Sequence, residues 1–378
     1  MEGIAVKITR ITDPKQFHTL REQWSNLLRN SPENNPFMTF EWLSTWWDVF
    51  GEGKKLCVIL VEDREELVAI APLYSHTRRI AGVSLREICL LGNQRVGSDF
   101  LGFIIKKGHD RNVLAAIGTE LNHEPHWDRL ALDDVDGDSP LLQHFHNLGK
   151  STGCYVSRRP ASTCPAMTLP ATWDEFMGQP DKIFKRIVQR ECVKKLHKRH
   201  QVELLLSVGD QPLAPWLQTL FELHTDRWHS AGQVGAFDDH RMKEFYSRVS
   251  ALFNQCGWLR LSALRVDGKV DVMEYGVVYG DTYYSLQGGC SAIGLELKAG
   301  HVLQYHIFES LVGHIHEFRF LRGAERYKYQ WGCADKWTAS LALHRGIKAQ
   351  AVGRGQTATR VIKGLIKKIA RRNRQPRK

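Results

Sequence analysis

The chain has 378 residues, of which 43% are hydrophobic and 25% are charged, an ordinary composition for a globular protein of about two domains. No apolar run approaches the ~18 residues of a membrane span, and the N-terminus lacks the basic segment and apolar core of a secretory signal. The eight cysteines show no C-x-x-C spacing, so we expect neither a zinc site nor disulfides, but reduced thiols in the cytoplasm.

The net charge of +11 is concentrated at the C-terminal end of the chain. Residues 336–378 contain 13 Lys or Arg and no acidic residue, which leaves the other 335 residues with a net charge of −2. The body of the protein is therefore close to neutral, so the overall charge does not by itself indicate nucleic-acid binding.

The first half of the chain begins with an aromatic helical segment, Phe40–Gly51, which is followed by a strand, a charged turn and a strand in residues 56–76. A helix from about Asp110 to Leu121 and a strand-like run at 127–136 follow. Asp110 places an acid at the start of this helix, where a phosphate needs free N–H groups alone. We therefore expect no cofactor site in the first half.

A basic helical segment, Asp181–Arg199, lies between the two halves. Its apolar stripe predicts that one face packs on the protein while the other face carries Lys and Arg. The basic face is either a plain solvated surface or a surface that steers an anionic glycan, lipid or CoA phosphate. After it, His224, Asp226 and His229 do not share one helix face, so we expect no metal site there.

The second half contains three strand-like runs, 259–266, 270–279 and 282–287, separated by the turn signals Asp267-Gly268 and Gly280-Asp281. A loop with Gly294 and Gly300 then opens a helix, and a short strand follows at 317–321. This order predicts a site where free N–H groups and the helix dipole can hold a phosphate. The same order of helix, strand, turn and strand occurs in the first half, which indicates a duplicated domain.

The string Gly323–Gly332, GAERYKYQWG, follows the last of these strands, and Leu297–Gly300 precedes the helix. With the order of elements, these strings resemble the tandem-GNAT acetyltransferases of the cellulose-biosynthesis (CelD-type) family, relatives of the Fem aminoacyl transferases, over about residues 34–337. The resemblance implies an α/β (α+β) fold with two GNAT-like domains in tandem, built from mixed, mostly antiparallel sheets with helices on both faces. The predicted parts are a degenerate domain (1–165), a linker helix (166–200), an acyl-CoA domain (201–340) and a basic tail (341–378).

The resemblance also implies transfer of an acetyl or related acyl group from acetyl-CoA, with no metal. The predicted cofactor-binding residues lie at the end of the third strand run and around the helix start: Gln287, Lys298, Ala299, Gly300, His301 and Val302. Gly300 permits close approach of a ligand, or simply starts the helix. Asp99, in a loop that the family places near the domain interface, is either a substrate contact or an ordinary turn residue.

Two residues are candidates for proton transfer. Glu274 lies in an uncharged strand run, where burial without a partner would raise its pKa and suit it to act as a general base. Alternatively it faces water or pairs with Arg322 or Lys328. Tyr327, which follows the last strand, is the candidate acid for the leaving thiolate, or a core residue.

Four residues are predicted to contact the acceptor substrate: Arg227, Trp228, Lys328 and Trp331. Lys328 would orient an acidic group, or form a surface ion pair. The expected acceptor is a small molecule or glycan, such as a polysaccharide or envelope precursor, in the cytoplasm. Two alternatives stay open, a Fem-like aminoacyl-tRNA-dependent transferase and a non-catalytic assembly factor.

The tail carries an apolar stripe at Val361, Ile362, Leu365, Ile366 and Ile369, flanked by Lys and Arg. Such a basic amphipathic helix can bind the anionic inner face of a membrane, although a solvated tail explains the same pattern. Nucleic acid is the less favoured partner because the tail has no aromatic residue to stack on bases.

Overall fold

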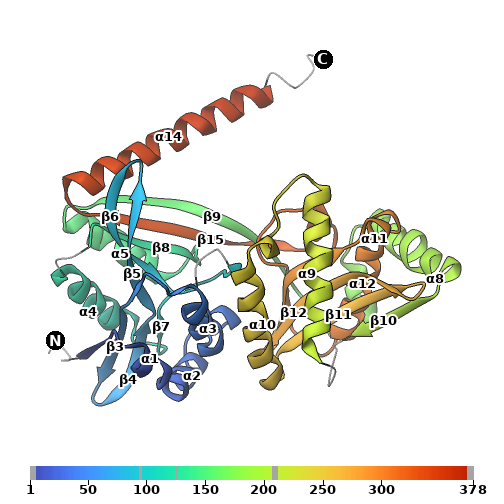
Figure 1. Cartoon of the computed structure of the whole chain (residues 1–378), viewed down its shortest axis with the longest axis horizontal. Coiled ribbons are helices and arrows are strands. Elements are labelled where there is room, and N and C mark those ends of the chain that lie inside the picture. Colours follow the sequence, from blue (N-terminus) through green and yellow to red (C-terminus); the bar gives the residue numbers. More distant parts are fainter. Residues whose placement is uncertain (1–5, 93–95, 125–126, 207–211, 373–378) are drawn as a thin grey trace.

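The computed structural model describes residues 6–92, 96–124, 127–206 and 212–372, with side chains described as far as Lys363. The two halves of the chain lie side by side, the N-terminal half at the left and the C-terminal half at the right of Figure 1. The helices before the strand β9 (Tyr155–Thr168) are α1 (Pro14–His18), α2 (Arg21–Arg29), η1 (Pro36–Met38), α3 (Phe40–Phe50), α4 (Asp110–His123) and α5 (Pro140–Ser151). The helices after β9 are α6 (Trp173–Gly178), α7 (Lys182–Arg186), the π-helical η3 (Ile187–Lys194), α8 (Lys195–Arg199), α9 (Leu213–Ser230), η4 (Ala236–Asp238), α10 (His240–Gln255), α11 (Ala292–Glu296), α12 (Ala299–Leu311), α13 (Arg326–Gln330) and α14 (Gly346–Arg372).

The described strands form two sheets, one with the order β1-β3-β4-β7 and a large one with the order β10-β11-β12-β13-β14-β9-β15-β8-β6-β5-β2. The strands of the N-terminal half are β1 (Lys7–Ile11), β2 (Lys55–Leu56), β3 (Val58–Asp63), β4 (Glu66–Ala71), β5 (Leu73–Ile80), β6 (Val83–Leu90), β7 (Ile104–Ile105), β8 (Arg129–Asp136) and β9 (Tyr155–Thr168). Those that follow are β10 (Val202–Leu206), β11 (Leu259–Val266), β12 (Lys269–Tyr279), β13 (Thr282–Cys290), β14 (Glu317–Arg319) and β15 (Ala334–His344). The paired strands are antiparallel except for β6 with β8 and β13 with β14, which are parallel.

Helices cover both faces of the sheet in the C-terminal half. Residues of α9 and α10 form one core with Met273, Tyr275 and Val277 of β12, whereas α12 forms a second core with Val272 of the same strand. Because successive strand residues point to opposite faces, these two cores lie on opposite sides of the sheet. The predicted fold class, a mixed and mostly antiparallel α/β structure, is confirmed.

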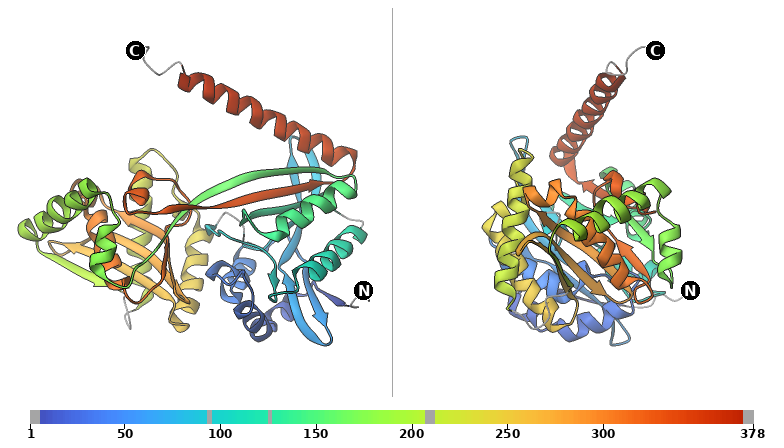
Figure 2. Two further views of the ribbon diagram at one scale, coloured as in Figure 1. Left: turned by 180° about the vertical axis from the view of Figure 1, so that it is seen from behind. Right: turned by 90° about the vertical axis from the view of Figure 1, so that its right-hand side faces the viewer.

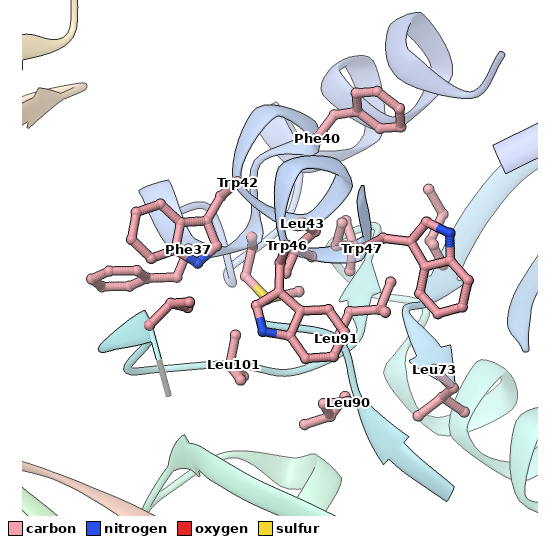
Figure 3. Packing of buried hydrophobic residues seen from close by; sticks show 14 of the residues in the cluster. Phe37, Phe40, Trp42, Leu43, Trp46, Trp47, Leu73, Leu90, Leu91 and Leu101 are labelled. Atoms are coloured by element: carbon pink, nitrogen blue, oxygen red, sulfur yellow. The ribbon is translucent and has the colours of Figure 1, made fainter. Parts of the chain in front are cut away.

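The helix α3 joins the two halves. The side chain of Thr39 caps it by accepting the backbone N–H of Trp42, and the tryptophans of the helix are buried (Figure 3). The Trp42 ring meets Phe245 of α10 edge-on at 4.8 Å and stacks on Phe253 at 5.9 Å between ring centroids. The two helices that precede the two strand meanders therefore pack on each other, and one hydrophobic core continues across the boundary.

The long strands β9 and β15 run from one half into the other (Figure 1). β9 pairs with β14 through Ala166–Thr168, and it pairs with β15 along the length of that strand. β15 also pairs with β8, so it lies between β8 and β9 in the sheet of the N-terminal half. The boundaries predicted after residues 165 and 340 thus fall inside β9 and β15. Two continuous strands join the halves at these positions.

The helix α14 leaves the N-terminal half and extends away from the body (Figures 1 and 2). Its first turns are attached, because Tyr155 Oη donates to Thr357 Oγ1 over 2.9 Å and the Arg354 guanidinium lies over the Tyr155 ring. Val361 and Ile362 are exposed, whereas the side chains of Leu365, Ile366 and Ile369 lie outside the described residues. Within residues 6–92, 96–124, 127–206 and 212–372, no helix is long and apolar enough to span a membrane.

Candidate active site

A cavity of about 400 Å³ opens beside β13, beyond the end of β14. The two strands pair in parallel at Thr282–Tyr284 and Glu317–Arg319; β14 ends there, whereas β13 continues to Cys290. Residues of β13 line one wall, the segment Phe320–Lys328 lines the opposite wall, and the ends of α9 and α12 complete the cavity. Beyond the end of β14, the second half of β13 has no parallel partner strand, and the cavity occupies the space between it and residues 320–328.

Glu274 projects from β12 into this cavity. Tyr283 of β13 donates its hydroxyl to Glu274 Oε1 over 2.9 Å. Gly276 makes this contact possible, because a Cβ at that position would lie 2.0 Å from the Tyr283 hydroxyl oxygen. The small residue lets the tyrosine ring cross the strand and hold the carboxylate in one orientation.

Burial raises the pKa of Glu274 to about 7, while the hydrogen bonds from Tyr283 and Ser285 lower it. Arg322, one of its predicted alternative partners, instead places Nη2 2.8 Å from Asp99 Oδ1, and Asp99 is buried. Lys328, the other predicted alternative partner, forms an ion pair with Glu325 through its ammonium group. Neither of these two cations therefore pairs with Glu274, whose raised pKa lets it bind and release a proton near neutral pH, as a general base requires.

The first turn of α12 borders the cavity through Lys298, Gly300 and His301. Lys298 adopts a left-handed backbone conformation with φ of 55°, and no side chain caps the helix. A Cβ at Gly300 would meet no atom within 4 Å, so the space in front of this residue is open. Unsatisfied N–H groups at a helix N-terminus beside open space suit the pyrophosphate of a CoA thioester. The side chains of Ala299 and Val302, in contrast, are buried in the core.

Gln287 lines the cavity from β13 and also contacts the domain interface. Its Nε2 donates to Tyr246 Oη over 3.1 Å, and Tyr246 Oη donates to the carbonyl oxygen of Val96 over 3.1 Å. Val96 belongs to the N-terminal half and Tyr246 to α10. This chain of hydrogen bonds fixes the cavity wall against the first half of the protein.

Tyr327 lies across the cavity, on α13, with its ring against His301 and Phe320 at centroid distances of 6.2 and 5.8 Å. Burial raises its pKa above the ordinary value of 10, and the nearby carboxyls of Glu325 and Glu274 add to this rise. The phenol therefore keeps its proton at neutral pH and can act as a hydrogen-bond donor to the sulfur of a leaving group.

Arg227 and Trp228 lie on α9 at the edge of the cavity. The Trp228 side chain is 39% exposed, and its Nε1 donates to Nε2 of the buried His224 over 3.0 Å. Burial lowers the pKa of His224 to about 4, so the imidazole stays neutral and serves as the acceptor that orients the indole. An exposed ring beside an exposed guanidinium forms a surface that an acceptor molecule with an anionic group can contact.

Lys328 and Trp331 are both buried, unlike the exposed Arg227 and Trp228 of α9. The buried ammonium of Lys328 donates to the carbonyl oxygens of Gly323 at 3.0 Å and Arg322 at 3.1 Å, and it pairs with Glu325 at 2.8 Å. Its donors hold the Phe320–Glu325 loop and are not directed at a substrate. The Trp331 ring is fully buried between aromatic side chains of the core and does not line the cavity.

Replacing Lys328 with Met is expected to lower the free energy of unfolding by about 1–3 kcal/mol, because the part-buried carbonyl oxygens of Arg322 and Gly323 lose their donor. Urea unfolding measures this effect, and Lys182→Met, at an exposed lysine of α7, serves as the matched control. Equal unfolding midpoints for the Lys328 variant and the wild type would show that the Lys328 ammonium does not stabilise the Phe320–Glu325 loop.

Sequence reasoning did not assign roles to Tyr283 or Glu325, and it offered Arg322 only as a partner of Glu274. Arg322 instead spans the halves, with its guanidinium 2.8 Å from Asp99 and 3.6 Å from Asp134. Asp99, predicted as either a substrate contact or a turn residue, is therefore an inter-half ion-pair partner. Gly276 is the sequence feature that could have indicated the position of the Tyr283 ring, because a glycine inside a strand indicates a close approach of another group.

Residues 185–329 match a family model described as an acetyltransferase (GNAT) domain. No curated protein matches the chain. The match covers the linker helix, the cavity and the Tyr327-Lys328 pair, but less than half of the chain. The match identifies residues 185–329 as a GNAT-like domain.

Among solved structures, FemX aligns with a TM-score of 0.61 at 12% identity, over 90% of this chain and 97% of its own. A tandem GNAT protein from the clavulanic acid biosynthesis pathway aligns with a TM-score of 0.50 at 9% identity, over 91% of this chain and 100% of its own. The C-terminal domain of a putative lysylphosphatidylglycerol synthetase from Agrobacterium fabrum aligns with a TM-score of 0.53 at 12% identity, over 91% of this chain and 97% of its own. At such low sequence identities, these structural alignments establish only the fold, which is GNAT-like across both halves. The narrower CelD-type assignment stays a prediction.

Proposed function

We propose that this protein is an acyltransferase that moves an acetyl or related acyl group from a CoA thioester to an amine or hydroxyl. The observation that carries the proposal is Glu274, a carboxylate with a pKa of about 7 that faces a cavity between β13 and the segment that follows β14. The uncapped start of α12 opens on the same cavity, so one space holds both a candidate phosphate site and a candidate base.

In the proposed reaction, Glu274 takes a proton from the acceptor nitrogen or oxygen, which attacks the carbonyl carbon of the thioester. As the new C–N or C–O bond forms, the C–S bond breaks and Tyr327 donates a hydrogen bond to the leaving sulfur. The thiolate then takes a proton from solvent, and Glu274 releases its proton to solvent. Tyr283 keeps the carboxylate in place, and the first turn of α12 holds the diphosphate of the donor through its N–H groups and Lys298.

For the acceptor, we propose a small molecule or glycan of a polysaccharide or envelope pathway, as the CelD-type resemblance implies. Trp228 can stack on a sugar ring, and Arg227 can pair with a carboxylate or phosphate on it. Both side chains are exposed at the cavity edge, where an acceptor can reach them. The reaction is proposed to take place in the cytoplasm.

A Fem-like reaction with aminoacyl-tRNA is the second candidate, favoured by the likeness to FemX over nearly the whole of both chains. A thermal-stability screen separates the candidates, because a ligand that binds only the native state raises the unfolding temperature. Stabilisation by acetyl-CoA or a longer acyl-CoA supports the first proposal, and stabilisation by aminoacyl-tRNA alone supports the second. Stabilisation by none of these donors, with no release of CoA in their presence, would favour a non-catalytic assembly factor.

We further propose that the end of α14 binds anionic membrane surfaces. Removing residues 361–378 is expected to abolish co-sedimentation with anionic vesicles and leave turnover of a soluble acceptor unchanged, because Arg354 and Thr357 still attach the helix to the body. Raised salt should weaken binding of the full chain. Equal sedimentation of the full and shortened chains would show that this helix is not a membrane contact.

A further inference from the structure

A second cavity, of about 340 Å³, lies in the N-terminal half, far along the chain from the residues of the candidate active site. It is formed by neighbouring strands of the large sheet, β5, β6 and β8. Its wall carries charged and sulfur-containing side chains, among them His76, Arg78, Glu87, Cys89 and Asp133. Glu87 is only 1% exposed, and a carboxylate this deep in a protein needs a specific partner.

Three of these side chains converge on one point. His76 pairs directly with Glu87 across β5 and β6, and Cys89 lies two residues further on the same face of β6. The His76 Nε2 atom lies 3.1 Å from Glu87 Oε2 and 3.8 Å from Cys89 Sγ. All three candidate donor atoms lie within 4.8 Å of one another.

Side chains this close together can reach a single metal ion after small rotations. A tetrahedral zinc ion holds nitrogen and oxygen at about 2.0–2.2 Å and sulfur at about 2.3 Å, which places neighbouring ligand atoms roughly 3.3–3.7 Å apart. An imidazole, a carboxylate and a thiolate together suit zinc or a similar borderline divalent ion, rather than magnesium or calcium. The adjoining cavity leaves room on the open side for a water ligand.

The surrounding residues also fit a metal centre. Arg129 forms an ion pair with Glu87 through Oε1, the oxygen that does not face His76. A second group bound to a ligating carboxylate fixes its orientation toward the ion. A divalent ion with one carboxylate and one thiolate would be neutral, which leaves Arg129 and Asp133 as opposite charges at the cavity. Arg78 Nη1 lies 3.7 Å from Glu87 Oε2, the oxygen that would bind the ion, and the Arg78 side chain is 56% exposed, so it can turn toward solvent when the ion binds.

We propose that His76 Nε2, Glu87 Oε2 and Cys89 Sγ bind one zinc-like divalent ion, with water as the fourth ligand from the cavity. Binding would displace the thiol proton of Cys89 to solvent and join β5 to β6, the hairpin that reaches α14 (Figure 1). The spacing of the ligands, with ten and one residues between them, belongs to no common zinc pattern. Strand pairing, which the cysteine spacing alone does not reveal, brings them together.

The test uses Co²⁺ as a spectroscopic probe on the full chain without an affinity tag. One equivalent is expected to give the visible absorption of a tetrahedral ion and a thiolate-to-cobalt charge-transfer band. Cys89→Ser should remove that band, and His76→Gln should weaken Co²⁺ binding by about 10–100-fold or more. Cys256→Ser, a half-buried cysteine at the end of α10, should retain both signals.

A second measurement does not depend on any variant folding. Zinc bound to the wild-type chain should protect Cys89 from alkylation, as read by peptide mass spectrometry, while Cys256 stays as reactive as in the metal-free chain. Binding without one-to-one stoichiometry, an unchanged cobalt spectrum in Cys89→Ser, or equal alkylation of Cys89 with and without zinc would each overturn the proposal.

Discussion

Replacing Glu274 with Gln is expected to lower turnover by about 10²–10⁴-fold, with donor affinity nearly unchanged. The amide keeps the size of the side chain and can still accept from Tyr283, but it cannot take a proton from the acceptor. Steady-state rates and donor binding by calorimetry measure the two effects separately. Glu296→Gln, at an exposed carboxylate of α11 near the cavity, is the matched control and should retain wild-type rates.

The pH dependence gives this prediction a second readout. A base with a pKa of about 7 is protonated below that pH, so kcat/KM of the wild type should fall as the pH drops below about 7. Folding stability should change in the opposite sense. The native state holds a proton between the ordinary pKa of 4.5 and about 7, whereas the unfolded state has lost it, so stability decreases as the pH rises through this window.

The Gln variant has no such proton to lose. It should therefore match the wild-type melting temperature near pH 4 and exceed it near pH 8, although it is the poorer catalyst. If Glu274→Gln has wild-type turnover and its kcat/KM still falls below about pH 7, proton transfer must be assigned to water or to another group.

Replacing Gly300 with Asp is expected to abolish measurable binding of acetyl-CoA while the fold persists. The position is open, with no atom within 4 Å of a built Cβ, so the new side chain fits. Its carboxylate would lie at the N-terminus of α12, where the negative charge of the donor's diphosphate is proposed to bind. An acidic residue also suits a helix N-terminus, so the variant should be at least as stable as the wild type.

Gly355→Asp is a matched control, because Gly355 also lies in a helix and a Cβ there would meet no atom within 4 Å. It adds the same charge to α14, away from the cavity, and should bind acetyl-CoA with wild-type affinity in calorimetry. Unchanged affinity in Gly300→Asp would move the donor site away from the start of α12.

Local patterns predicted the elements around the cavity closely. The alternating run 259–266 is β11, and the aromatic segment that begins at Phe40 is α3. Glu274, Tyr327, Gly300 and Gln287 were chosen from separate segments, and the fold brings all four to one cavity. These features depend on hydrophobic period, turn residues and a resemblance, all of which a single sequence contains.

Features that depend on long-range pairing could not be predicted in the same way. Nothing near Lys328 indicates that its ammonium turns inward to the carbonyls of the Phe320–Glu325 loop, which a basic residue on a short helix does not ordinarily do. The position of β15 between β8 and β9 depends on which of several apolar strands pairs with each sheet edge. Tertiary packing decides that competition.

The place of β15 in the sheet imposes an order on synthesis of the chain. β8 and β9 emerge early, but the strand that lies between them follows β9 only after 165 further residues, the segment 169–333. At ~5–20 residues per second, the ribosome needs roughly 10–30 s to deliver it. During that interval the facing edges of β8 and β9 lack their partner, which makes them open to pairing with foreign strands. The half made first is therefore the half completed last, and its nascent form is where a chaperone would be most useful.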